Sequence, residues 1–103
     1  MMEQSIASIL GFAQKAGKLV SGEESTLEKV RRRQAKLVII SKDAALNTAE
    51  RMQSKASCYG IPVCTVGNKI ELGQAIGKSP RSVIGIIDKN FAAKINDLVE
   101  GSW

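Results

Sequence analysis

The sequence predicts an α/β fold, a three-layer α/β/α sandwich around a mixed, largely parallel sheet of roughly four strands. Short apolar runs alternate along the chain with segments in which apolar residues recur every three or four positions. Such alternation is typical of βαβ units with right-handed crossovers, whose helices cover both faces of a sheet. A chain of 103 residues with 44% hydrophobic residues has the size of one ordinary domain, which we expect over residues 1–103.

The first two helices and the strand between them are predicted from spacing and caps. Apolar residues at helical spacing are followed by Gly17 and predict a helix over residues 3–16, with a short strand or connector over residues 18–21. Ser21 and Glu24 have the spacing of a capping box, in which two side chains satisfy free amides at a helix start. A second helix is therefore expected after Ser21, ending near the run of three arginines.

The middle of the chain is expected to form a strand, a helix and a second strand. The run Leu37–Ile40 shows no polar alternation and is rich in β-branched residues, which is typical of a strand buried on both faces. Asn47 and Glu50 repeat the capping-box spacing and predict a helix that ends near Gly60. The next strand is expected over residues 61–66.

The last part of the chain is expected to add two helices and one strand. Asn68 and Glu71 form a third capping-box pattern and predict a short helix through Ile76. Residues 83–87 predict the last buried strand. Apolar residues at helical spacing predict the final helix: Phe91, Ile95 and Leu98.

The charge balance favours a polyanionic partner. The chain has 15 Lys and Arg against 10 Asp and Glu, a formal net charge of +5. Its longest apolar run is far shorter than the roughly 20 residues of a membrane-spanning helix. Residues 1–20 also lack the charged segment and apolar core of a signal peptide. We therefore expect a cytoplasmic, monomeric protein with no membrane partner.

No catalytic, cofactor or metal site is predicted. The chain has no histidine, and Cys58 and Cys64 match neither a redox pair nor paired zinc ligands, so we expect two buried structural thiols. The segment LGQAIGKS, residues 72–79, imitates a nucleotide-binding phosphate loop. It has three residues between its glycines where that loop needs four, and it closes a helix instead of opening one. We therefore expect a binding protein and not an enzyme.

Four segments of the chain resemble one family. AKLVIISKDA, GIPVCTVGNKIELGQAIGK and SVIGIID, in this order and separation, resemble the ribosomal protein L7Ae/L30e family. The opening segment FAQKAGKLVSGEE is most similar to its small bacterial YlxQ-type branch. The resemblance covers roughly residues 9–93. It implies an α/β/α domain that binds RNA, in many members a kink-turn, which is a sharply bent duplex with tandem sheared G·A pairs.

The resemblance also implies which residues meet the RNA, at the start of the second helix and in the loop before the last strand. Gly22 matches the family glycine that lets RNA approach the helix start, and Lys69 matches the lysine before the Leu-Gly pair. Glu24 and Ser25 stand where kink-turn binders commonly have Asn-Glu, and Glu28 stands where they usually have Lys. The expected RNA-binding residues are Gly22, Glu24, Ser25, Glu28, Arg32, Lys69, Lys78, Ser79 and Arg81.

Two functions stay open at this point. The first is binding of structured, kink-turn-like RNA, including ribosomal RNA, by a ribosome-associated protein. The second is a protein-interaction or ribosome-docking module of the same fold, because carboxylates at Glu24 and Glu28 repel phosphate and cannot donate to guanine. A solvated helix end would by itself explain the three consecutive arginines. We expect six cations at element ends to lie toward one edge of the sheet: Lys18, Arg32, Lys42, Lys69, Lys78 and Arg81.

Overall fold

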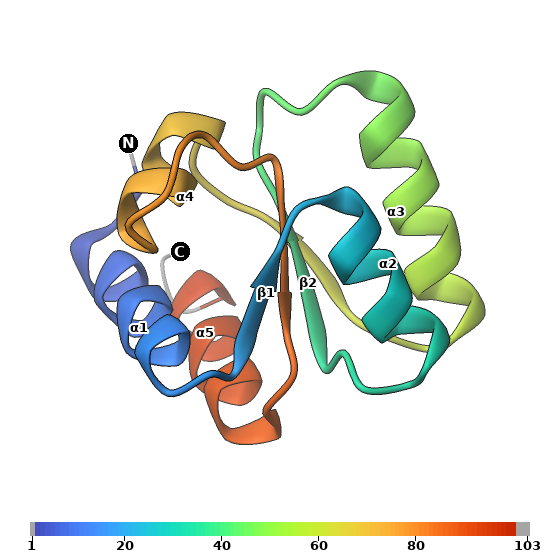
Figure 1. The fold of residues 1–103 in the computed structure, drawn as a ribbon, viewed down its shortest axis with the longest axis horizontal. Coiled ribbons are helices and arrows are strands. Elements are labelled where there is room, and N and C mark those ends of the chain that lie inside the picture. Colours follow the sequence, from blue (N-terminus) through green and yellow to red (C-terminus); the bar gives the residue numbers. More distant parts are fainter. Residues whose placement is uncertain (1, 101–103) are drawn as a thin grey trace.

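The computed structural model describes residues 2–100, and these form five helices and four strands. The three-layer α/β/α sandwich is confirmed, because α1, α4 and α5 cover one face of the sheet and α2 and α3 cover the other (Figure 1). In chain order the elements are α1 (Gln4–Lys15), β1 (Leu19–Ser21), α2 (Glu23–Arg31), β2 (Leu37–Ile40), α3 (Leu46–Cys58), β3 (Val63–Thr65), α4 (Lys69–Ala75), β4 (Val83–Ile86) and α5 (Lys89–Glu100).

The sheet is mixed, as expected, and its strand order is β1-β4-β2-β3. Only β2 and β3 are parallel, whereas β4 is antiparallel to both β1 and β2. The expectation of a largely parallel sheet is therefore wrong. The reason is the length of α4, whose seven residues span about 10 Å. The segment from α4 to Arg81 begins and ends at the same end of the sheet, since the Arg81 amide donates to the Lys69 carbonyl oxygen at 3.0 Å. The strand β4 therefore starts where β3 ends and runs in the opposite direction.

The two ends of the sheet collect different loops. We call one end the Ser21 edge, because Ser21 stands there close to the ends of β2 and β3 and the start of β4. The loops before α2, α3, α4 and β4 lie at this edge, at the top of Figure 1. We call the other end the Lys36 edge, and the loops before β1, β2, β3 and α5 lie there.

Burial on both faces of the sheet follows from the apolar run in β2. Leu37 and Ile39 pack toward α1, α4 and α5, while Val38 and Ile40 pack toward α2 and α3. All four side chains are buried, and each such burial stabilises the fold by roughly 1.5–3 kcal/mol. The uninterrupted run therefore correctly predicts a central strand between two helical layers.

One of the three capping boxes is confirmed. The Glu71 amide donates to Asn68 Oδ1 at 2.8 Å, and the Asn68 amide donates to Glu71 Oε1 at 3.0 Å. The expected boxes at Ser21 and Asn47 are wrong, since neither α2 nor α3 has a side-chain cap. Ser21 still belongs to β1, and Asn47 lies one residue inside α3. Pairing of Ser21 with Ile84 therefore overrides the local cap signal at α2, and α3 begins before Asn47 without a side-chain cap.

The two cysteines have different environments. Cys64 is buried in β3, and desolvation raises the pKa of its thiol to about 11. Cys58 is exposed at the end of α3, so the expectation of a buried thiol is wrong for this residue. It lies on the outer side of the helix, whereas Met52 and Ala56 face the sheet. None of the described helices is long and apolar enough to cross a membrane.

Candidate nucleic-acid interface

The start of α2 presents free backbone donors at the Ser21 edge. Gly22, its N-cap, has φ 97° and ψ 153°, a conformation adopted almost only by glycine. A Cβ added to Gly22 would meet no other atom within 4 Å, so conformation and not crowding requires glycine. The first amide of α2 that donates a helical hydrogen bond is that of Thr26, which donates to the Gly22 carbonyl oxygen at 3.1 Å. The preceding amides therefore suit an anionic or carbonyl acceptor.

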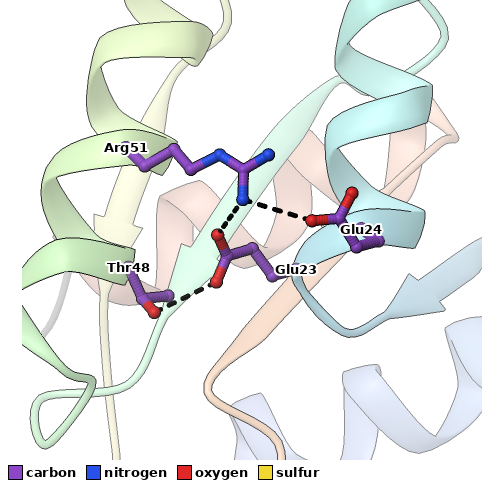
Figure 2. A network of polar contacts seen from close by, with 4 residues as sticks. All are labelled: Glu23, Glu24, Thr48 and Arg51. Carbon is purple, nitrogen blue, oxygen red and sulfur yellow. Dashed lines mark hydrogen bonds and ion pairs between the residues drawn. The ribbon is translucent and has the colours of Figure 1, made fainter.

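The acidic first turn of α2 is tied to α3 by an arginine (Figure 2). Arg51 Nη1 lies 2.6 Å from Glu23 Oε2 and 3.2 Å from Glu24 Oε1, and these two carboxylates raise the pKa of Arg51. Thr48 Oγ1 donates to the other oxygen of Glu23 at 3.0 Å. The guanidinium thus offsets part of the negative charge that faces a ligand at this helix start.

The remaining expected residues of α2 extend away from this edge. Ser25 is exposed in the first turn, and Glu28 is exposed one turn later. Arg32 Nε lies 3.3 Å from Glu28 Oε1, with the two side chains 66% and 61% exposed, so solvent screens this pair strongly. Arg32 is the C-cap of α2. It is therefore separated from Gly22 by the length of the helix.

The loop at residues 77–82, before β4, packs closely against α4 at Gly73. An added Cβ on Gly73 would lie 2.9 Å from the Lys78 carbonyl oxygen and closer still to that of Ser79. The Lys78 amide donates to the Gly73 carbonyl oxygen at 2.8 Å. The glycine that resembled part of a phosphate loop therefore has a packing role, which brings residues 77–82 against α4.

Arg81 fastens the same loop to β1. Its Nε donates to Ser21 Oγ at 3.1 Å, and its Nη1 donates to Ser79 Oγ at 2.7 Å and to the Ser79 carbonyl oxygen at 3.1 Å. The Gly22 amide donates to the Val83 carbonyl oxygen at 2.8 Å. These bonds place the two segments expected to meet RNA side by side. Within residues 2–100, the exposed ammonium of Lys78 has no protein partner.

The start of α4 completes the arrangement. The Lys69 amide donates to Asp43 Oδ1 at 2.9 Å, while its carbonyl oxygen accepts from Arg81. Partial desolvation raises the pKa of Asp43, but the hydrogen bond from the Lys69 backbone contributes to a net pKa below its ordinary value. Asp43 is therefore ionised near neutral pH. It holds Lys69 beside the loop that contains Lys78.

The structure gathers four of the six cations expected at one edge. Those at the Ser21 edge are Lys42, Lys69, Lys78 and Arg81. The expectation is wrong for Lys18 and Arg32, which lie at the Lys36 edge. Lys18 precedes β1, and its carbonyl oxygen accepts from Ile87 beyond the end of β4 at 3.0 Å. Lys18 precedes the start of β1 and Arg32 follows the end of α2, and both of these positions are at the end of the sheet opposite Ser21.

Sequence reasoning did not find Thr48, Arg51 or Asp43. The contact between Arg51 and Glu23 joins residues 28 positions apart, and no local pattern signals it. The sequence shows only that Glu23 and Arg51 have opposite charges. This becomes informative once α2 and α3 are known to be neighbours. The polar face formed by Thr48 and Arg51 at helical spacing is consistent with that contact.

Comparison with known proteins identifies clear relatives. Residues 4–96 match the family described as "Ribosomal protein L7Ae/L30e/S12e/Gadd45 family". Two relatives are named RNA-binding protein YlxQ. One, from Enterococcus faecium, is 41% identical over 98 residues, which cover 95% of this chain and 94% of the relative. The other, from Bacillus subtilis, is 38% identical over 92 residues, which cover 89% and 92%.

A solved structure supports the same relationship. The fold matches that of a Giardia lamblia 15.5kD RNA binding protein with a TM-score of 0.81 and 25% sequence identity. The match covers 96% of this chain and 91% of the other. The similarity in fold therefore extends over nearly the whole of both chains.

Proposed function

Because the chain belongs to the ribosomal protein L7Ae/L30e/S12e/Gadd45 family, we propose that it binds structured RNA of the kink-turn type through its Ser21 edge. The RNA is ribosomal, and the protein acts in the cytoplasm as a single, monomeric RNA-binding domain without enzymatic activity. One observation carries the proposal. The start of α2 and the loop at residues 77–82, which are distant in sequence, are bonded together through Arg81 and Ser21 at one edge.

The chemistry of this edge suits a sharply bent RNA. The free amides at the start of α2 are donors of the kind that guanine O6 and phosphate oxygens accept. Lys69 and Lys78 stand on α4 and on the adjacent loop, where they can neutralise phosphates on either side of the bend. Contacts to phosphates fix position, whereas contacts to base edges select the RNA. In this proposal the amides of α2 supply the selection and the lysines supply the affinity.

The carboxylates at the same helix start do not prevent this contact. Glu23 and Glu24 would repel phosphate if they stood alone. Arg51 Nη1 lies between one oxygen of Glu23 and one oxygen of Glu24 (Figure 2). The net charge of these three side chains is therefore that of one carboxylate and not of two. The docking alternative had rested on the carboxylates of Glu24 and Glu28. Each of them lies within ion-pair distance of an arginine, Arg51 and Arg32 respectively, so the RNA-binding proposal is favoured.

The direct test compares two RNAs of equal length. A kink-turn RNA is expected to bind more tightly than a control in which Watson–Crick pairs replace the sheared G·A pairs. Both affinities should fall as salt rises, by roughly 0.7–0.9 log units per log unit of salt for each neutralised phosphate. Fluorescence anisotropy at several salt concentrations measures both effects. Equal affinity for the two RNAs, or no binding to either at low salt, would contradict the proposal.

Replacing Glu28 by lysine is expected to strengthen kink-turn binding. The change exchanges an exposed acceptor for a donor one turn along α2 from Glu24, and the expected gain is about 1 kcal/mol, at the lower end for a base contact. The fold should tolerate it, because the pair with Arg32 contributes only about 0.3–0.5 kcal/mol. Affinity for the kink-turn RNA is measured by calorimetry.

The matched control for this change is Asp97→Lys, which alters the net charge equally at an exposed position of α5. Its effect on kink-turn affinity should be smaller than that of Glu28→Lys. The Watson–Crick control RNA should also gain less from Glu28→Lys. If both RNAs gain equally, Glu28 meets only phosphate. If neither gains, the RNA does not lie along α2.

A further inference from the structure

The end of the molecule opposite the proposed RNA site carries a second cluster of cations. Arg33 and Lys36 line a shallow cleft together with Tyr59 and Pro62. Lys36 also lines the neighbouring cleft, which shares Pro62 and includes Lys89 at the start of α5. Arg33, Lys36 and Lys89 therefore form a continuous basic strip across the Lys36 edge. We call these three residues the Lys36 patch.

Arg33 is held in a conformation that side chains generally avoid. Its φ is 60°, and it is the only non-glycine residue with a positive φ within residues 2–100. It follows the C-cap of α2, where glycine is usual because a Cβ raises the free energy of this backbone shape. The chain keeps an arginine here, with its guanidinium 5.0 Å from the centre of the Tyr59 ring. Backbone strain of this kind is typical of functional positions.

The patch also differs from the Ser21 edge in how its charge is balanced. At the Ser21 edge, Glu23 and Glu24 both hold Arg51. Within residues 2–100, no carboxylate forms an ion pair with any of the three patch cations. The acid next to the patch, Asp88, accepts from the Phe91 amide at 3.0 Å at the start of α5. The three patch cations therefore have no paired carboxylate in the described chain, whereas the Ser21 edge has the acids Glu23, Glu24 and Asp43 beside its cations.

The shape and composition of the patch indicate the kind of partner. Its two clefts measure about 210 and 290 Å³, below the roughly 300–1,000 Å³ of pockets that enclose small molecules. The exposed large apolar side chains are Phe12, Leu46 and Ile70, and none belongs to either cleft. Within residues 2–100, an exposed large aliphatic or Phe side chain of the kind that inserts into a membrane is therefore lacking at these clefts. Guanidinium and ammonium groups beside an aromatic ring suit a phosphodiester backbone.

We propose that the Lys36 patch binds the phosphate backbone of a second RNA segment, a duplex recognised by its shape. The run from Gly22 to Arg33 is about 16 Å long at a helical rise of 1.5 Å per residue. This exceeds the Debye length of about 8–10 Å at physiological salt. The two surfaces therefore act on different phosphates, and one molecule joins two RNA segments. This goes beyond the proposed function, which concerns the Ser21 edge alone.

Two pairs of substitutions separate the patch from general charge. The patch variant is Arg33→Gly/Lys36→Gln, in which glycine also relieves the positive φ. The control variant is Lys15→Gln/Lys94→Gln, which removes the same charge from exposed positions outside the patch. The melting temperature of the patch variant should be no lower than that of the control variant. A second patch variant, Lys36→Gln/Lys89→Gln, leaves the Arg33 backbone and its contact with Tyr59 unchanged.

The probe is a fluorescent unbent RNA duplex, titrated into protein already saturated with unlabelled kink-turn RNA. The duplex is expected to bind without displacing the kink-turn RNA. Both patch variants should weaken duplex binding about tenfold at low salt and reduce its salt slope by roughly 1.4–1.8, the value for two lost phosphate contacts. Their affinity for the kink-turn RNA should change less than about twofold, and the control variant should behave like the unmodified protein.

Three results would overturn the inference: displacement of the kink-turn RNA by the duplex, equal losses in the patch and control variants, or poly-L-glutamate binding as tight as that of the duplex. The last would assign the patch to an acidic protein. The test also separates this inference from the proposed function. Intact kink-turn binding without a patch effect contradicts the inference alone. A patch effect without kink-turn preference contradicts the proposed function alone.

Discussion

Reversing the charges of Lys78 and Arg81 together is expected to weaken kink-turn RNA binding by about a hundredfold or more, on the scale of two contacts at roughly 1–3 kcal/mol each. Both residues lie in the loop that is bonded to the start of α2. Carboxylates at these positions would face the RNA with the wrong charge on the side opposite the free amides. Anisotropy titration of Lys78→Glu/Arg81→Glu with a kink-turn RNA measures the loss.

The two single reversals should differ in stability. The sequence alone predicts that reversing both charges together leaves the melting temperature nearly unchanged. The hydrogen bonds of Arg81 to Ser21 and Ser79 change that expectation, because Arg81→Glu leaves their oxygens facing a carboxylate, at a cost of roughly 1–3 kcal/mol. Lys78 has no protein partner in the described chain, so Lys78→Glu should weaken RNA binding at an unchanged melting temperature.

The comparison of Lys78→Glu with Lys55→Glu, an equal charge change at an exposed position of α3, isolates the role of the loop. Lys78→Glu should cost at least about tenfold in kink-turn affinity, and Lys55→Glu should cost clearly less. If folded Lys78→Glu protein binds the RNA like the unmodified protein, the loop is only a connector and the Ser21 edge is not the interface.

Replacing Gly73 by alanine is expected to dislodge the same loop. The new Cβ would meet the backbone of Lys78 and Ser79, which cannot rotate away as a side chain can. Overpacking of this kind costs roughly 1–3 kcal/mol in the free energy of unfolding. Because Lys78 and Arg81 shift with the loop, kink-turn affinity should fall about tenfold as well. Chemical denaturation measures the first effect and RNA titration the second.

Gly60→Ala is the matched control for this change. Unlike Gly73, Gly60 has a positive φ, and the space around it is open within 4 Å. Alanine there therefore strains the backbone without touching the loop at residues 77–82. It should lower stability at the Lys36 edge and leave kink-turn affinity unchanged. A Gly73→Ala protein with normal stability and normal RNA affinity would mean that α4 does not seat the loop.

The sequence predicts most of the fold because its signals there are local. The unbroken apolar run of β2 and the capping box of α4 correspond directly to a buried strand and a capped helix start. The direction of β4 is not local, since it depends on α4 being too short to return the chain across the sheet. The cap expected at Ser21 failed for a related reason, because strand pairing and the conformation of Gly22 determine where α2 begins. Asn47 is not a cap because α3 already begins at Leu46.

The candidate site could be predicted in part. The resemblance to a family identified Gly22, Lys69 and the loop from Lys78, and these residues do lie at one edge. It also identified Arg32, which lies at the other end of α2. Arg51 could not be found, because its role arises from the packing of α3 against α2 and from no motif. The spacing of residues along the chain predicts which side chains share a face of one helix or strand. A site formed between several helices and strands depends on how these pack together in three dimensions.

Amide NMR tests directly whether kink-turn RNA lies on the Ser21 edge. Spectra of the labelled protein are compared with and without a kink-turn RNA. We predict the largest shifts at the amides of Glu23–Ser25 and Lys69 and at those of Lys78, Ser79, Arg81 and Ser82. Shifts confined to α1 and α5, or a pattern that the Watson–Crick control RNA reproduces in full, would contradict this prediction.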